Sequence, residues 1–206
     1  MVILINKYMN TINQQRNLFY SKYHGKSQKI LNVYLSAACK SADINSIEYL
    51  LISPELSVHA DIHHNDDEPL ASAYSRNHYD IVDYLLTSEK LKDKANINYK
   101  DGALLEAACH KGDLRFMDYL LNSNELPNNI KLNKKVLEIA CVHGHLDIVK
   151  YLFNSPSLKE HPSIKEPNNA AINSARENGY LEILKCLLLP NDLDHASMTN
   201  EKRFKI

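Results

Sequence analysis

Two short segments of the chain gather side chains that bind metal ions or transfer protons. The chain has ten histidines, and the two segments are formed by His59, Asp61, His63, His64, Asp66 and Asp67, and by Cys141, His143 and His145. Imidazole, thiolate and carboxylate groups are the usual zinc ligands and the usual general acids and bases. Neither segment shows the Cys-x-x-Cys or His-Glu-x-x-His spacing of a zinc site. A small metal-dependent enzyme is therefore only an alternative, and we expect no metal site and no cofactor.

Other catalytic patterns are missing from the sequence. The five glycines stand apart from one another, so no glycine-rich loop can hold phosphate groups through its backbone amides. No Gly-x-Ser-x-Gly motif occurs. Glu106 and Glu138 suggest a carboxylate pair, but they are one position of a repeat seen twice. We therefore expect a protein without catalytic residues.

Charge is unevenly distributed along the chain. The 24 Lys and Arg residues against 25 Asp and Glu residues give a net charge of −1, so no overall field attracts nucleic acid or membranes. Residues 1–32 contain five bases and no acid, which leaves 19 bases against 25 acids in the remainder. A row of Arg76, Lys111 and His143 is interrupted by Ser41 and Asn178. Phosphate binding requires a continuous basic stripe, so we expect a protein partner and not nucleic acid.

The same pattern returns about every 35 residues. A Tyr-Leu-Leu or Tyr-Leu-Phe segment recurs at steps of 35, 35 and 32 residues, and a Cys-Leu-Leu segment follows 35 residues later; they begin at Tyr49, Tyr84, Tyr119, Tyr151 and Cys186. An alanine stands eleven residues before each of them, at Ala38, Ala73, Ala108, Ala140 and Ala175. This period predicts stacked repeats, each of which buries its apolar face only against its neighbours.

Each copy of the repeat predicts two helices with a tight turn between them. Gly112, Gly144 and Gly179 stand four residues past the alanine, where glycine suits the left-handed conformation that ends a helix. A second helix follows, and its apolar stripe in the fourth copy is Leu146, Val149, Leu152 and Phe153. A serine after this helix predicts one further short turn, and a short polar finger leads into the next copy.

These features resemble the ankyrin repeat. His143-Gly144-His145-Leu146-Asp147-Ile148-Val149 is similar to the family's most recognisable stretch, and Glu68-Pro69-Leu70 is similar to its Thr-Pro-Leu-His segment. The resemblance covers about residues 33–193 and implies an all-α solenoid of five helix-turn-helix repeats. It also implies a non-catalytic module that binds a protein partner on a concave face.

The loops after the second helices are longer than in the family pattern. This variety is similar to ankyrin proteins of intracellular bacteria, many of which are injected into host cells. The resemblance thus implies an effector that acts on a host protein in the host cytoplasm. The alternative within the same class is a regulatory subunit or inhibitor of a bacterial partner protein.

The expected binding surface combines the exposed side of each first helix with the fingers. Residues three past the repeat alanine are expected to share one face because they hold the same position in each repeat. They vary in type while the apolar positions are kept, as expected of a surface that suits a partner. The partner-binding residues that we predict are Arg76, Lys111, His143 and Asn178 on the first helices, with Asp66, Asp67, Asp101 and Lys134 projecting from the fingers beside them.

The two ends of the chain stand outside the repeats. Residues 1–32 are predicted to form a basic helical cap over the first repeat, ended by Gly25, with Ser27 capping a helix that runs into the first copy. Their alternative role is to dock on a membrane or an acidic partner. Residues 194–206 are expected to be a short tail. We expect a monomer.

The cysteines point to a reducing compartment. Cys39, Cys109 and Cys141 each follow a repeat alanine, so neighbouring ones are expected about 8–10 Å apart, too far for a disulfide. Cys186 replaces a repeat tyrosine. No stretch has the roughly 20 apolar residues of a membrane span, and the apolar start of the chain is too short for a secretion signal. These features predict a cytoplasmic location.

Overall fold

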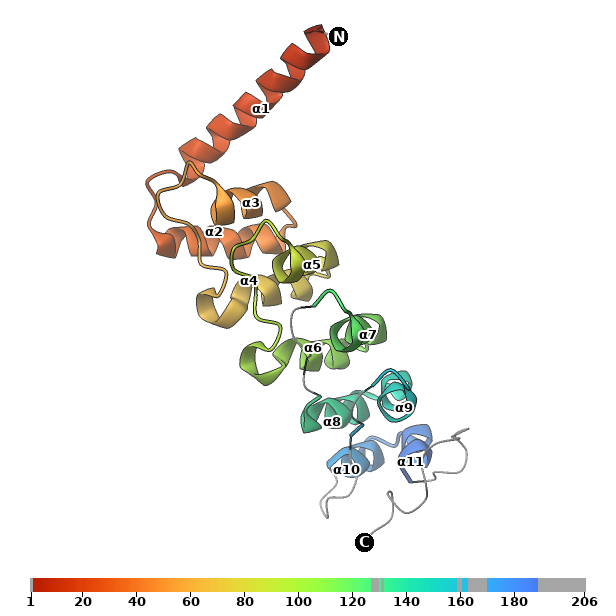
Figure 1. The fold of residues 1–206 in the computed structure, drawn as a ribbon. Helices are drawn as coiled ribbons and strands as arrows, with labels where there is room; N and C mark the ends of the chain where they lie inside the picture. Colours follow the sequence, from red (N-terminus) through yellow and green to blue (C-terminus); the bar gives the residue numbers. More distant parts are fainter. Residues whose placement is uncertain (1, 127–129, 131, 159–160, 163–169, 189–206) are drawn as a thin grey trace. The chain divides into compact units, whose positions relative to one another are not determined.

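The computed structural model describes residues 2–126, 130, 132–158, 161–162 and 170–188, leaving aside the side chains of 2–10, 12 and 134 (Figure 1). These residues form helices and turns without a strand. The helices are α1 (Val2–Tyr23), α2 (Gln28–Lys40), α3 (Ile44–Ile52), α4 (His64–Ser75), α5 (Tyr79–Thr87), a 3-10 turn η1 (Tyr99–Asp101), α6 (Ala103–Lys111), α7 (Leu114–Asn122), α8 (Lys134–His143), α9 (Leu146–Asn154), α10 (Ala170–Glu177) and α11 (Leu181–Leu188). From α2 onward they form five helix pairs, as the period predicts.

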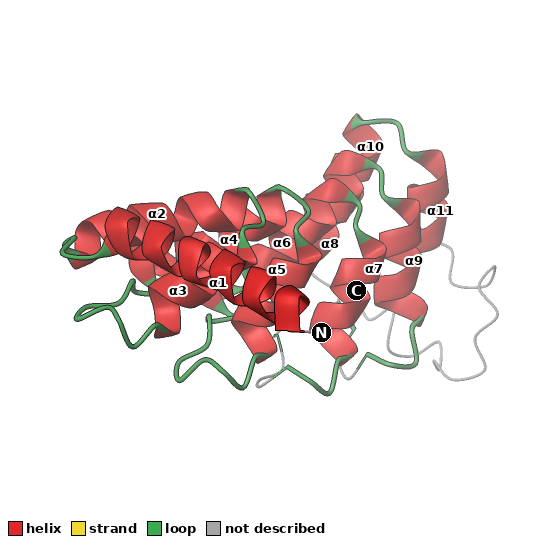
Figure 2. Cartoon of the chain, turned by 90° about the horizontal axis from the view of Figure 1, so that it is seen from above, coloured by secondary structure: helices red, strands yellow, loops and turns green. Residues whose placement is uncertain are grey.

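The chain divides into two compact units, residues 1–96 and 97–206. The first unit holds α1 and the helix pairs α2/α3 and α4/α5, with α2 packed against α4. The second unit holds three helix pairs. Seen from above, α8 lies beside α10 and α9 beside α11 (Figure 2). The predicted all-α repeat fold is therefore confirmed.

The turn between the paired helices is the same in all five copies. The repeat alanines are buried, and the N–H of the residue five positions later donates to the alanine carbonyl at 2.9–3.1 Å. The residue in between, four past the alanine, has a φ between 55° and 75°. Glycine fills this left-handed position in the last three copies, while Ala42 and Asn77 fill it in the first two. These bonds satisfy the carbonyls at the end of the first helix.

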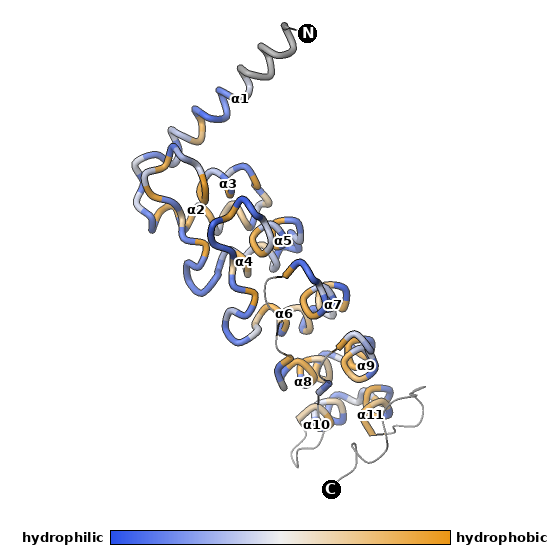
Figure 3. Tube along the Cα trace, in the orientation of Figure 1, coloured by the Kyte–Doolittle hydropathy of each residue, from blue (hydrophilic) through white to orange (hydrophobic). Residues whose placement is uncertain are grey.

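The second helices bury most of the predicted apolar stripe, but not its first position. Val149, Leu152 and Phe153 are buried, as are Val82 and Leu85 in the second copy. The stripe's first residue is half-buried at Leu146 and exposed at Tyr79 and Leu181, because it lies in the first turn of the helix. Apolar and polar residues alternate along these helices, as expected of elements with one buried face (Figure 3). In the first and third copies the second helix is capped by an aspartate whose carboxylate accepts a backbone N–H at 3.1 Å, at Asp43 and Asp113.

The serine after the second helix of each of the first four copies makes one hydrogen-bonded turn, as predicted. The Ser53, Ser88 and Ser155 carbonyls accept an N–H from the leucine three residues on. The hydroxyls of Ser53, Ser88 and Ser123 accept an N–H from the residue two positions on. Each serine also ends the preceding helix. The chain therefore leaves the second helix through a compact turn and not through a further helix.

Helix α1 packs on the first repeat through its last two turns. Tyr23 is buried, and its hydroxyl donates to Ser46 Oγ at 3.0 Å. The rings of Phe19 and Tyr23 lie 5.2 and 5.8 Å from the ring of Tyr49 on α3. The described side chains between Thr11 and Leu18 are exposed, and α1 extends beyond α2 and α3 in Figure 1. Arg16 on α1 also pairs with Glu55 after α3, so the side-chain contacts described between α1 and the first repeat lie between Arg16 and Tyr23.

Candidate protein-interaction surface

The residues three past each repeat alanine are all exposed. They sit where the first helix ends, at Ser41, Arg76, Lys111, His143 and Asn178. The Ser41 hydroxyl donates to the carbonyls of Ala37 and Ala38, and the Asn178 amide donates to the carbonyl of Ser174. These two side chains are turned back onto their own helices. Arg76, Lys111 and His143 carry the chemically distinctive groups of the row.

The second unit brings three histidines and a lysine together. The ring centroids of His110 and His143 lie 4.1 Å apart, and those of His143 and His145 lie 6.0 Å apart. His145 is held in place because its Nε2–H donates to the carbonyl of His110 at 3.1 Å. Lys111 follows His110 at the end of α6. This group is called the histidine cluster below, and it links the ends of α6 and α8.

The histidine cluster lowers the tendency of His143 to take up a proton. Partial burial and the neighbouring His110 and His145 lower the pKa of His143. Burial also lowers the pKa of Lys111, although Asp113 opposes this effect. A surface that holds neighbouring imidazole rings and one ammonium group can accept an aromatic, amide or carboxylate group of a partner. The sequence analysis did not predict His110 as a binding residue. The available signal was its position directly before Lys111, which was predicted to be exposed.

Asp66 and Asp101 are exposed, as predicted, and occupy equivalent places one period apart. Each lies in a run of three residues with left-handed backbone conformation. Residues 65–67 form the first turn of α4, and residues 100–102 come directly before α6. They stand at the beginning of α4 and α6, whereas Arg76 and Lys111 stand at the ends. A helix of eight residues is about 12 Å long. The acidic and basic predictions therefore lie at opposite ends of the same helices.

Asp67 does not project, and the prediction was wrong on this point. Only 4% of Asp67 is exposed. Its Oδ1 accepts the backbone N–H of Asn96 at 2.8 Å and contacts His63 Nδ1 at 2.9 Å. The equivalent residue of the first copy, Asn32, is also buried and accepts the N–H of Asp61 at 2.8 Å. The position holds the next finger in place, so it is structural. The side chain of Lys134, also predicted to bind, lies outside the described residues.

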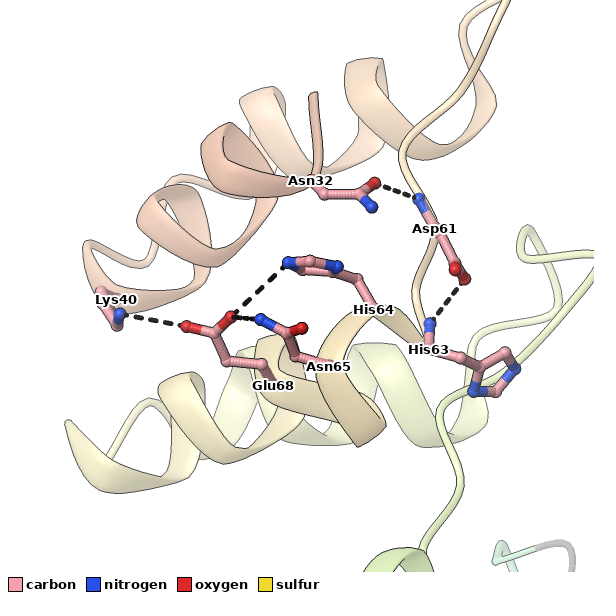
Figure 4. A network of polar contacts seen from close by, with 7 residues as sticks. All are labelled: Asn32, Lys40, Asp61, His63, His64, Asn65 and Glu68. Atoms are coloured by element: carbon pink, nitrogen blue, oxygen red, sulfur yellow. Dashed lines mark hydrogen bonds and ion pairs between the residues drawn. The ribbon is translucent and has the colours of Figure 1, made fainter. Parts of the chain in front are cut away.

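The first histidine-rich segment is divided among separate contacts (Figure 4). His59 Nε2 donates to the Ser53 carbonyl at 2.8 Å. His63 reaches Asp67 and Asp93, while His64 Nε2 lies 3.8 Å from Glu68 Oε2. Across the residues that the structure describes, no group of three or more His, Cys, Asp or Glu side chains is arranged to hold a metal ion.

The cysteines are free and buried, as expected. Burial raises the pKa of Cys39, Cys109 and Cys141 to about 12. The Cys109 thiol donates to the Val136 carbonyl at 3.1 Å. Because the thiolate is the nucleophile and metal ligand, these thiols are poor candidates for either role, and Cys141 does not extend the histidine cluster.

Within the described ranges, no helix is both long enough and apolar enough to span a bilayer. Comparisons with curated proteins and with solved structures gave no match. Residues 104–201 match the family model for ankyrin repeats, in three copies. The two copies before residue 104 share the buried alanine, the left-handed turn and the carbonyl hydrogen bond of the matched copies. Residues 104–201 are therefore ankyrin repeats, and the first two copies have the same turn geometry.

Proposed function

We propose that the chain is a non-catalytic module that binds a protein partner through the exposed ends of its first helices. Ankyrin repeats generally mediate protein–protein interaction. The observation that supports the site is the contrast between two positions of the repeat. The alanine is buried in every copy, whereas the residue three positions later is exposed in every copy and differs in each, as Ser, Arg, Lys, His or Asn. A position that is exposed and free to vary suits a partner and not the fold.

The binding residues of this proposal are Arg76, Lys111 and His143, with Asp66 and Asp101 at the other ends of α4 and α6. The histidine cluster adds His110 and His145 to the surface. Asp67 is left out because it is buried. Charged groups across an interface determine the encounter rate and the choice of partner, so the cations are the residues to reverse first.

The test compares two double variants with the same change of charge. Arg76→Glu with Lys111→Glu should reduce capture of the partners identified by affinity purification and mass spectrometry, because like charges across an interface cost several kcal/mol. Arg115→Glu with Lys150→Glu reverses two exposed cations on second helices and should leave capture unchanged. Melting temperatures of both should stay close to the original, since exposed substitutions usually shift stability by less than about 0.5 kcal/mol.

Full capture by the Arg76/Lys111 variant would contradict the proposed surface. The source of the captured protein decides between the two roles within this class. Partners from host lysate support an effector that acts in a host cell. Partners from bacterial lysate alone support a regulatory subunit or inhibitor.

A further inference from the structure

One face of α2 carries apolar residues that the first unit leaves exposed. Ile30 is 45% exposed and Val33 is 62% exposed, and Ala37 is exposed as well. Their spacing of three and four residues places them on one side of the helix. We call Ile30, Val33 and Ala37 the open face of α2.

The same positions in later copies show what this face normally contacts. Glu68 stands where Val33 stands, one period later, and its carboxylate lies 3.5 Å from Lys40 Nζ on the preceding first helix, α2 (Figure 4). Lys135 stands at the same position of the fourth copy and contacts Glu106 on the preceding first helix, α6, at 3.7 Å. Ser72, the counterpart of Ala37, is only 5% exposed. In these copies, therefore, the face is turned toward the preceding first helix, and in the second copy Ser72 is buried there.

Helix α1 does not take the place of that neighbour. It contacts α3 through Phe19 and Tyr23 and reaches α2 at Tyr34, whose ring centroid lies 5.2 Å from that of Tyr23. Leu18, one turn before Lys22 on α1, is 62% exposed. The open face is thus bordered by α1 on one side and is not covered by its described part.

The border of the open face is basic. Lys22 Nζ lies 5.5 Å from the centre of the Tyr34 ring, which places this charge between α1 and α2. Lys26 and Lys29, at the beginning of α2, are exposed. Residues 1–32 contain no acid at all. A ligand of this surface must therefore match an apolar strip with a cationic border.

We propose that the open face of α2 docks an amphipathic helix with acidic flanks, supplied by a protein partner. The apolar side of that helix would cover Ile30, Val33 and Ala37, as a preceding first helix would, and its carboxylates would meet Lys22, Lys26 and Lys29. This surface is distinct from the row of Arg76, Lys111 and His143.

The charge and the shape of the surface separate this occupant from two others. A second copy presenting the same face would bring lysines against lysines, which is unfavourable. A bilayer favours an extended apolar face beside basic residues, but the described side chains of α1 from Asn13 to Asn17 are all polar or charged and exposed. A helix needs only the narrow strip that α2 offers.

The experiment measures binding of a labelled synthetic helix to the full chain by fluorescence anisotropy. The probe is a peptide of about 18 residues, or five turns, with a leucine stripe flanked by glutamates. Its control has the same stripe flanked by lysines. The acidic probe should bind at least about tenfold more tightly than the basic one, and its affinity should fall with added salt.

Two matched variants localise the binding. Val33→Glu should weaken the acidic probe at least about tenfold, because it places a carboxylate in the strip, as Glu68 does in the second copy. Val58→Glu, an equivalent change at an exposed valine of the loop after α3, should not change the affinity. Circular dichroism melts verify that both variants are folded.

Four results would overturn the proposal. They are absence of binding of the acidic probe up to about 100 μM, equal binding of the basic probe, and unchanged affinity in Val33→Glu. The fourth is evidence that another occupant binds this face. Such evidence would be flotation of the chain with phosphatidylcholine vesicles containing about 30% phosphatidylserine, or self-association in sedimentation, if Val33→Glu abolishes it. None of these results bears on partner capture through Arg76 and Lys111, so the two proposals fail independently.

Discussion

His63 shows how a single side chain fastens the second repeat. Its Nδ1 lies 2.9 Å from the buried Asp67, and its Nε2 lies 3.2 Å from Asp93 in the segment after α5. Burial alone would lower the pKa of His63, but the hydrogen bonds that its ring donates to the carboxylates of Asp67 and Asp93 outweigh this effect, and the pKa is raised. A raised folded-state pKa means that protonated His63 stabilises the fold more than neutral His63 does.

The pH dependence of stability follows from this shift. The contribution of His63 should be fully present below its ordinary pKa of 6.5 and should be lost as the pH rises through the raised folded-state value. Denaturant unfolding of the original chain and of His63→Gln across about pH 5 to 8 should show a stability difference that shrinks with rising pH. Asp93→Asn should reduce that slope. A difference that does not depend on pH would contradict the assignment.

The turn glycines of the last two copies differ in their surroundings. Gly144 and Gly179 have φ values of 74° and 72°. A Cβ on Gly144 would lie 2.8 Å from Cζ of the Tyr180 ring, whereas a Cβ on Gly179 would meet nothing within 4 Å. Alanine at a left-handed position costs about 1–2 kcal/mol, and Ala42 shows that the turn accepts it.

Gly144→Ala should therefore destabilise the chain more than Gly179→Ala. The second substitution carries only the backbone cost, while the first also displaces an aromatic ring from its contact with the turn. The free energies of unfolding in urea measure the difference. Equal costs would mean that the Tyr180 ring moves aside freely.

The repeat period predicts the burial and conformation of those residues that depend only on the helices of their own copy. The buried alanines, the left-handed turn residues and the exposed row after them were all predictable because each follows from helix geometry within one copy. Asp67 was not, because its burial depends on an N–H from Asn96 29 residues later. The sequence signal was a polar residue at the same position of the first copy, Asn32, which lay within the segment predicted as a cap.

The pairing of the second helices contains a similar contact between copies. Tyr151 on α9 donates its hydroxyl to Asp118 Oδ1 on α7 at 2.8 Å. Burial and this carboxylate raise the pKa of Tyr151 to about 12. Lys150 stands at the position of Asp118 in the fourth copy, and Cys186 stands at the position of Tyr151 in the fifth copy. The fourth copy therefore lacks the carboxylate, and the fifth copy lacks the hydroxyl that would donate to it.

Helix α1 allows a test of how far the N-terminal segment acts as a cap. Tyr23 is 1% exposed and touches both α2 and α3 through its ring and hydroxyl contacts, whereas Tyr20 on the same helix is 46% exposed. Tyr23→Ala should cost roughly 3–5 kcal/mol, and Tyr20→Ala should stay within about 0.5 kcal/mol. Thermal melts of the two variants compare them directly. Similar melting temperatures would show that α1 contributes nothing to the first repeat.

At the scale of the whole molecule, stability is divided along the chain. In a stack of repeats, the free energy of the fold is close to a sum of repeat and nearest-neighbour contributions. Such a chain can lose one part of its structure while another part remains folded. The division into residues 1–96 and 97–206 suggests where the loss would stop.

Leu85 and Leu152 provide a matched pair for this prediction. They hold the same repeat position, one in each unit, and neither is exposed at all. Leu85→Ala and Leu152→Ala should each cost roughly 2–5 kcal/mol, because each leaves a cavity in a packed core. Hydrogen exchange followed by mass spectrometry should show protection lost first in residues 1–96 for Leu85→Ala and first in residues 97–206 for Leu152→Ala. Uniform loss of protection along the chain in both variants would mean that the five repeats unfold as one cooperative unit. In that case the free energy of contacts between neighbouring repeats would exceed the local cost of either cavity.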